Sequence, residues 1–187
     1  MKKIIITFIC IISLTSLSTA QEKLKININK SSIKWMGELT FHFGGHDGFI
    51  KFKEGYFLKT KDVITGGKFI IDMNSITNTD IKDKKGKDSL VKHLMEPDFF
   101  DVKKHPLTTL IISNVEYFKD KSMRIHANLT LKGITKPIWF NAIPNYQEKS
   151  LRAKFKINRQ EWNVSYKSKF KNNVISDAIG FEVILKL

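Results

Sequence analysis

Cysteine is almost absent from this chain of 187 residues, since Cys10 is the single one. It lies within Ile4–Leu14, an apolar segment that follows two lysines and precedes small residues ending at Ala20. Basic start, apolar stretch and small residues, in this order, are typical of a cleaved signal peptide. We therefore expect residues 1–20 to be removed. The mature domain, residues 21–187, would then contain no thiol and no disulfide.

Long apolar runs are also lacking. Ile4–Leu14 is shorter than the roughly 20 residues that a membrane-spanning helix requires, and no other segment of the sequence approaches that length. The sequence thus predicts a periplasmic or secreted protein. The alternative is that the first segment is retained as an anchor.

Acidic residues are scarce relative to basic ones: 18 against 32, for a net charge of +14. Such a balance favours anionic partners, such as acidic membrane surfaces or phosphorylated small molecules. Export makes nucleic acid an unsuitable partner, so none is predicted. The alternative explanation is that the lysines keep a strand-rich protein dissolved and protect the edges of its sheets.

Motifs for catalysis and metal binding are missing as well. The sequence has no Gly-x-Ser-x-Gly elbow, no glycine-rich phosphate loop ahead of a helix, and no His-Glu-x-x-His. His42 and His46 could share a strand face, but no third ligand is evident. Asp72 and Asp80 are expected to be a strand-end and a loop carboxylate rather than an acid–base pair. We predict no enzyme, no metal and no cofactor.

What the chain does contain is alternation of apolar and polar residues with a period of two. It is clear over Leu24–Ile28, Met123–Leu131, Leu151–Ile157 and Ile179–Leu187. This pattern predicts strands with one face toward water and one toward an interior. Eight or nine strands in succession, joined by short connections, predict an all-β antiparallel barrel or two packed sheets.

Several segments depart from the simple pattern. Leu107–Phe118 is mixed on both faces, and Glu54-Gly55, Gly66-Gly67 and Lys132-Gly133 predict turns or bulges. Asp88–Met95 has apolar residues at helical spacing, and Pro97 ends it. We expect a short helix here, followed by an apolar loop with Phe99 and Phe100 across one end of the barrel. The charged residues 82–88 are expected to form a solvated loop.

Short motifs spread over most of the mature chain resemble the YceI-like family of secreted lipid-binding barrels. They include Trp35-x-Gly37, His46-x-Gly48, the segment from Gly67 to Ile76, Asp80, the run from His93 to Val102, His105-Pro106, the run from Leu129 to Pro137, Ile157-Asn158-Arg159, Tyr166 and Asp177. The resemblance implies an eight-stranded, antiparallel, lipocalin-like barrel. It also implies an elongated apolar pocket for a polyisoprenoid or another long-chain amphiphile.

Two positions depart from the family pattern. The family often has Asp-Arg where this chain has Asn158-Arg159, which puts in doubt a carboxylate partner for Arg159. It often has Tyr-Gly-Ser where this chain has Tyr166-Lys167-Ser168, which suggests a changed loop near the rim of the pocket.

The residues predicted to bind the ligand combine pocket-lining apolar side chains with a few polar ones. They are Trp35, His46, Phe69, Ile71, Phe99, Phe100, Phe155, Arg159, Trp162, Tyr166 and Phe181. Three alternatives remain open at this point. The barrel core could be solid, the two adjacent phenylalanines could only cap it, and the arginine could tie two loops together instead of holding a phosphate or carboxylate head group.

The favoured function is an exported carrier or store for a polyisoprenoid, an isoprenoid quinone or a fatty amphiphile. A basic protein that binds the envelope surface through a solid barrel is the alternative. An enzyme acting on isoprenoid phosphates, through Arg159 or His46, is the third hypothesis. Contact with an anionic membrane is a further prediction, and a homodimer is left open.

Overall fold

The computed structural model describes residues 21–39, 44–165 and 175–187. All of its strands belong to a single sheet in which neighbouring strands are antiparallel. The elements, in chain order, are β1 (Glu22–Lys25), β2 (Ser32–Leu39), β3 (Gly45–Thr60), β4 (Val63–Asp72), the 3₁₀ turn η1 (Met73–Ser75), α1 (Lys84–Met95), β5 (Leu107–Tyr117), β6 (Met123–Leu131), β7 (Ile134–Asn145), β8 (Ser150–Asn158), the 3₁₀ turn η2 (Arg159–Trp162) and β9 (Ile175–Lys186).

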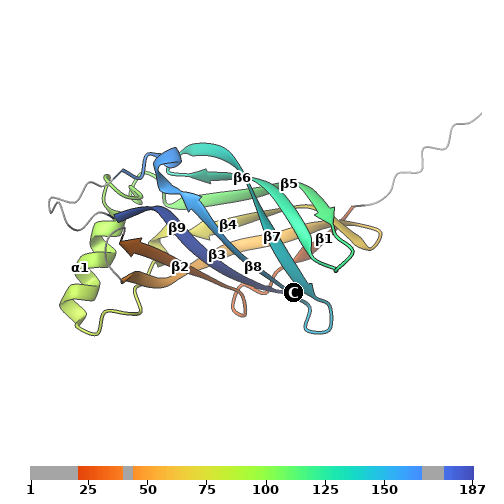
Figure 1. The fold of residues 1–187 in the computed structure, drawn as a ribbon, viewed down its shortest axis with the longest axis horizontal. Coiled ribbons are helices and arrows are strands. Elements are labelled where there is room, and N and C mark those ends of the chain that lie inside the picture. Colours follow the sequence, from red (N-terminus) through yellow and green to blue (C-terminus); the bar gives the residue numbers. More distant parts are fainter. Residues whose placement is uncertain (1–20, 40–43, 166–174) are drawn as a thin grey trace, which may run out of the picture.

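The sheet closes on itself and forms a barrel (Figure 1). The strand order is β1-β3-β2-β9-β8-β7-β6-β5-β4, and β3 pairs with β4 to complete the ring. The long strand β3 pairs with β2 near its start and with β1 near its end. β1 and β2 therefore occupy successive parts of one position, and the ring has eight positions. The expected eight-stranded antiparallel barrel is confirmed.

The break between β1 and β2 corrects the strand predicted over Leu24–Ile28. The strand ends at Lys25, and the backbone oxygen of Asn27 accepts hydrogen bonds from the N–H groups of Lys30 and Ser31. The Asn27 side chain accepts a second bond from the Lys30 N–H. Because such local bonds compete with sheet pairing, the chain turns here. Ile28 is consequently 41% exposed rather than buried.

The three glycine-containing sites predicted to be turns or bulges lie at one turn and near two bulges. Lys132 and Gly133 both have positive φ (51° and 75°) and form the two-residue turn between β6 and β7. Turns of this hand match the twist of the flanking strands. Register shifts lie between Phe52 and Glu54 and between Leu58 and Lys59, the latter opposite Gly66. Bulges increase the local bend of a strand, which helps a sheet to close.

Helix α1 begins earlier than the sequence predicted. The Asp83 side chain caps it by accepting a hydrogen bond from the Gly86 N–H at 2.7 Å. Lys84 forms an i,i+4 ion pair with Asp88 on the exposed face. The predicted solvated loop over residues 82–88 is therefore mostly the first turn of the helix. The sequence pattern missed it because this turn buries little, so its charges carry no helical period of apolar residues.

The helix lies at one end of the barrel, and several of the β-hairpins lie at the other (Figure 1). Leu94 of α1 is buried together with Phe99, Phe100 and Val102 of the following loop. These four side chains join the same apolar core as the inward residues of the strands. The short helix and apolar loop predicted near one end of the barrel are confirmed.

Candidate functional site

The lumen of the barrel contains a cavity of about 210 Å³. A single buried water needs only about 10–15 Å³, so this space is far larger than a packing defect. Inward side chains of β2 to β9 supply most of its wall, with Leu90 and Leu94 of α1 and with Phe99 and Phe100. Eight-stranded barrels are either filled by their own side chains or hold one slender ligand. The side chains of this barrel leave part of its interior unfilled.

Two groups of aromatic rings form opposite parts of the cavity wall. Phe69 of β4 packs against Phe57 and Phe52 of β3, with ring centroids 5.0 and 6.1 Å apart. On the other side, Phe155 of β8 stacks on Phe140 of β7 at 4.4 Å and lies 5.5 Å from Phe181 of β9. Such ring pairs stabilise each other by about 0.5–1.5 kcal/mol beyond the area they bury. They hold these parts of the wall in place around the lumen.

The predicted lining residues Phe69, Ile71, Phe155 and Phe181 all face this cavity. Alternation along their strands was enough to identify them. Phe57 and Phe140 also line the cavity, and they were not among the residues predicted to bind the ligand.

The cavity reaches the surface at the end of the barrel that carries α1. Gly45 and His46, at the start of β3, are exposed and also line the cavity. Phe99 and Phe100 are buried beside this opening, and the Phe99 ring meets the His93 ring edge-on with centroids 5.2 Å apart. The two phenylalanines therefore form part of the cavity wall, in addition to capping the core.

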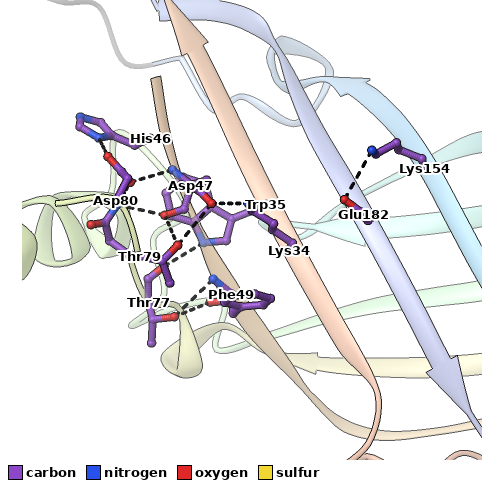
Figure 2. A network of polar contacts seen from close by, with 11 residues as sticks. Lys34, Trp35, His46, Asp47, Phe49, Thr77, Thr79, Asp80, Lys154 and Glu182 are labelled. Carbon is purple, nitrogen blue, oxygen red and sulfur yellow. Dashed lines mark hydrogen bonds and ion pairs between the residues drawn. The ribbon is translucent and has the colours of Figure 1, made fainter. Parts of the chain in front are cut away.

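A polar network joins the start of β3 to the segment after η1 (Figure 2). The Nδ1 atom of His46 lies 2.8 Å from an Asp80 carboxylate oxygen. Asp80 also accepts hydrogen bonds from the Asp47 backbone N–H at 2.9 Å and from the Asn78 side chain. Burial alone raises the pKa of Asp80, but these three hydrogen bonds outweigh it and lower that pKa from 3.8 to about 2. Asp80 is thus an anion fixed beside the opening.

Trp35 is held by the same segment. Its indole N–H donates to the Thr77 backbone oxygen at 3.0 Å, while its ring lies in the cavity wall (Figure 2). The hydrogen bond satisfies the polar end of the side chain and leaves the apolar ring available to the lumen. Asp72 is elsewhere in the fold and caps η1 through the Asn74 N–H. The structure therefore does not bring Asp72 and Asp80 together as an acid–base pair.

Arg159 lies beside the cavity but is used by the protein itself. Its side chain donates to the backbone oxygens of Ser176, Val164 and Ile175. It also forms an ion pair with Asp177 at 3.1 Å. Because Asn158 replaces the usual aspartate, the sequence put in doubt a carboxylate partner for Arg159. The structure corrects this: Arg159 has such a partner, and it is Asp177 of β9. The arginine connects η2 to the start of β9. This matches the alternative that Arg159 holds two parts of the chain together instead of a head group.

Trp162 and Tyr166 were also predicted to bind the ligand. Trp162 is 1% exposed and donates its indole N–H to the Leu129 backbone oxygen at 3.2 Å, and it is not among the residues that line the cavity. The structure therefore places it in the core outside the lumen, as a packing residue. Tyr166, with the predicted change of loop at residues 166–168, lies outside the described residues.

Thr108 on β5 lines the cavity and was not identified from the sequence. Leu107–Phe118 showed no clean alternation, so no inward face could be assigned to it. Within the described ranges, no group of three histidine, cysteine, aspartate or glutamate side chains could hold a metal ion. No helix in those ranges is long and apolar enough to cross a membrane.

Comparison with known proteins adds to this geometry. The YceI-like domain profile matches residues 13–187, nearly the whole chain. The chain belongs to the YceI-like family. The motifs from Trp35 to Asp177 therefore reflect a true relationship.

A solved structure with this fold is BcnA of Burkholderia cenocepacia, with a TM-score of 0.70 and 17% identity. The alignment covers 86% of this chain and 98% of BcnA, so the two share the barrel fold. A UPF0312 protein of Pseudomonas putida is 38% identical over 58 residues. That segment is 31% of this chain and only 30% of the relative's length.

Proposed function

We propose that this YceI-like protein binds one long-chain apolar molecule, a polyisoprenoid or a related amphiphile, and acts as its carrier or store. The observation that carries the proposal is the hollow lumen. It is walled by inward apolar and aromatic side chains and reaches the surface beside His46. A barrel that served only as a scaffold would gain stability from filling such a space, because empty apolar volume destabilises a folded protein.

The driving force for binding would be removal of the hydrocarbon chain from water. Each Å² of buried apolar surface contributes about 25 cal/mol, so a chain that buries roughly 400 Å² gains about 10 kcal/mol. Association costs about 4–15 kcal/mol in lost freedom, so the net affinity depends on how well the chain fits the lumen. The stacked rings of Phe140, Phe155 and Phe181 favour a good fit because they fix part of the wall before binding.

A binding role fits the polar side chains at the opening better than catalysis does. His46 is paired with Asp80, and Arg159 is occupied by three backbone oxygens and Asp177. General acid–base catalysis needs a group that can reach the reacting atoms of a substrate. These groups instead join segments of the chain to one another.

Residues 1–20 support export, because their order of charge, apolar stretch and small residues matches a signal peptide. The proposed site of action is the periplasm or the exterior of the cell. A carrier there would move a molecule that water does not dissolve. Protein purified from cells is expected to carry such a molecule, which mass spectrometry of an organic extract would identify.

A lumen-filling substitution tests the proposal directly. Ala153 of β8 lines the cavity and pairs with Ala142 and Val183 on its neighbouring strands. Ala153→Phe would place a ring in the lumen and is expected to lower affinity for polyisoprenoids at least tenfold. Overpacking costs about 1–3 kcal/mol, so the variant should still fold. Affinity is measured by displacement of a fluorescent fatty probe.

The matched control is Lys154→Phe, one residue further along the same strand. Lys154 points to solvent and pairs with Glu182 at 3.5 Å (Figure 2). This variant adds the same ring on the outer face and leaves the lumen unchanged, so affinity should stay at the wild-type level. Equal binding by both variants, or no extractable lipid and no uptake by the wild type, would contradict the proposed function.

A further inference from the structure

Exposed aromatic, apolar and basic side chains lie together on the outer surface of β7 and its neighbours β6 and β8 (Figure 1). Along β7, Trp139 and Ile143 are 62% and 66% exposed, and buried residues alternate with them. Phe118, which follows β5, is 39% exposed. We call Phe118, Arg124, Trp139, Ile143 and Arg152 the β7 patch.

The members of the β7 patch form one continuous surface. The Arg124 guanidinium lies over the Trp139 ring at 5.0 Å and over the Phe118 ring at 5.3 Å. Ile143 lies on the same face of β7 as Trp139, and it pairs with Arg152 of β8. Single apolar side chains on a surface need no explanation, but a contiguous group rimmed by charge marks a site of interaction.

Neither arginine of the β7 patch has a carboxylate partner. Among the described residues, no ion pair joins Arg124 or Arg152 to an acidic group, and the residues outside the described ranges include no aspartate or glutamate. Glu116, which lies opposite Arg124 on β5, bonds to His126 instead. A lysine of β9 holds Glu148 at the turn between β7 and β8. Two guanidinium groups are therefore available to an external anion.

An anionic phospholipid surface offers both kinds of contact that this patch needs. Indole rings settle at the boundary between lipid and water, and guanidinium groups bind phosphate through paired hydrogen bonds. The net charge of +14 attracts the protein to such a surface from a distance. A second copy of the chain fits less well, because a symmetric dimer places the same patch on both sides of the interface. Arginines would then face arginines.

We propose that the β7 patch docks the protein onto an anionic phospholipid surface. Phe118, Trp139 and Ile143 enter the boundary between head groups and acyl chains, and the two arginines bind lipid phosphates. The inference goes beyond the proposed function and does not depend on it, because no member of the patch lines the cavity. For a carrier of an apolar molecule, docking brings the barrel to the membrane in which such a molecule dissolves.

Co-sedimentation with lipid vesicles tests the proposal. The protein used is residues 21–187, which contain every strand of the described barrel and lack the apolar segment Ile4–Leu14. Vesicles of phosphatidylglycerol and phosphatidylethanolamine should bind it, and vesicles of phosphatidylcholine should not. Binding should weaken as salt is added, because salt screens the attraction between exposed charges.

Substitutions within the β7 patch should weaken this binding. Trp139→Ala is expected to lower the affinity for anionic vesicles about tenfold, because less apolar surface leaves the water. The double variant Arg124→Gln and Arg152→Gln should lower it about 25-fold, since each basic side chain near an anionic surface contributes about fivefold. All of these side chains lie on the outer surface, so the variants should unfold at the temperature of the wild type.

Tryptophan fluorescence shows which surface touches the lipid. Trp139 is exposed, whereas the other two tryptophans, Trp35 and Trp162, are 8% and 1% exposed. Lipids with bromine on their acyl chains should therefore quench the fluorescence of the wild type and quench that of Trp139→Ala much less.

Matched changes on β3, which lies across the ring of strands from β7, serve as controls. Phe49→Ala removes an aromatic ring that is 41% exposed. The double variant Lys51→Gln and Lys53→Gln removes two exposed charges, as the arginine variant does. Both should bind anionic vesicles within about threefold of the wild type, because the attraction of a charge to the surface fades within a Debye length.

Three results would overturn the inference. They are a wild type that does not bind anionic vesicles, equal binding by the β7 patch variants and the β3 variants, and a wild-type dimer in solution that Trp139→Ala dissociates. The last result would make the patch an interface between two copies of the chain. Uptake of the fluorescent fatty probe, which every variant should retain, decides separately whether the proposed function stands.

Discussion

Arg159 shows how a buried charge can serve the fold instead of the ligand. Arg159 is 3% exposed, and the bonds of its side chain connect η2 and Val164 to the start of β9. A segment outside the described residues separates these two pieces in the sequence, and the pairing of Asn158 with Ala178 also brings them together. The guanidinium suits this role because its rigid fork offers several donors at fixed angles.

Arg159→Met is expected to lower the free energy of unfolding by about 3 kcal/mol, because three backbone oxygens lose their donor inside the protein. Denaturant titration measures it. Asp177→Asn is the companion variant. The Asp177 side chain is 61% exposed, so its loss should lower stability by less than about 1 kcal/mol. Unchanged stability of Arg159→Met combined with lost ligand binding would show that the arginine binds the ligand after all.

Asp80 is the residue for which a pH effect is expected. Its pKa is lowered to about 2 in the folded protein, against 3.8 for the free group. The folded state then favours the anion, so the stabilisation is complete above pH 4 and is lost as the pH falls toward 2. The carboxylate is partly exposed, which reduces the effect to about 1 kcal/mol.

The measurement compares the wild type with Asp80→Asn in denaturant titrations at several pH values. The wild type should be more stable by about 1 kcal/mol near neutral pH, and the difference should shrink between pH 4 and pH 2. Other carboxylates affect both proteins alike, so they cancel in this difference. A difference that stays constant down to pH 2 would show that the hydrogen bonds to Asp80 do not depend on its charge.

At the scale of elements, β5 explains why one strand could not be assigned a face from its sequence. Up to Ile112, its even-numbered residues Thr108 and Leu110 line the cavity. A register shift lies between Ile112 and Asn114, and beyond it Val115 pairs with the buried Ile125. A bulge adds one residue and moves the inward set to the odd positions. The sequence of β5 follows one alternation before the bulge and the opposite one after it, so no single period of two runs through the strand.

Helix α1 is held by its cap, by the buried Leu94 and by Leu90, Val91 and Met95, which are partly buried against the core. Asp83→Ala removes the acceptor for the Gly86 N–H and should weaken the helix by about 1 kcal/mol. The expected result is amide hydrogen exchange about fivefold faster in residues 84–95, with exchange in the barrel strands unchanged. Asp83→Asn keeps a capping acceptor and should behave as the wild type. Faster exchange throughout the barrel would show that the helix and the barrel open together.

At the scale of the whole molecule, the cavity sets an upper limit to the ligand length that contributes to binding. Its wall runs from the opening near Gly45 and His46 into the barrel, where side chains such as Phe57 and Leu151 line it. Met123 and Ala142, which pair with each other on β6 and β7, are fully buried and do not line the cavity. A chain longer than the lumen must leave its excess carbons in water.

A series of fatty alcohols of increasing length tests this limit. Affinity should rise by about 0.8 kcal/mol per buried CH₂ group and then stay constant once the lumen is full. Isothermal titration calorimetry measures the affinity of each alcohol. The heat-capacity change of binding should be negative and should grow in magnitude over the chain lengths for which affinity still rises, because more apolar surface is buried. An affinity that keeps rising with chain length would mean that the chain binds outside the lumen.

The sequence by itself determined the all-β class and most of the inward apolar residues. Alternation left a barrel and two packed sheets open, and the resemblance to the YceI-like family implied the barrel. Period-two alternation is a local property of a strand, and it survives wherever one face is buried. The sequence also located the turn at Lys132-Gly133, because the positive φ that such a turn needs is a property of the turn residues themselves. The first turn of the helix, after Asp83, and the turn at Asn27 were missed, because side-chain hydrogen bonds set both of them and the apolar pattern there is weak.

Only the tertiary structure decided whether the lumen is hollow, because the same inward residues can fill a barrel or surround a space, depending on its closure. It also decided the roles of polar residues. Asp177 reaches Arg159 from another strand, Asp80 meets His46 across a separation of 34 residues, and Thr108 finds no partner at all. Such pairings depend on which strands become neighbours, and the alternation of a single strand carries no information about its neighbours.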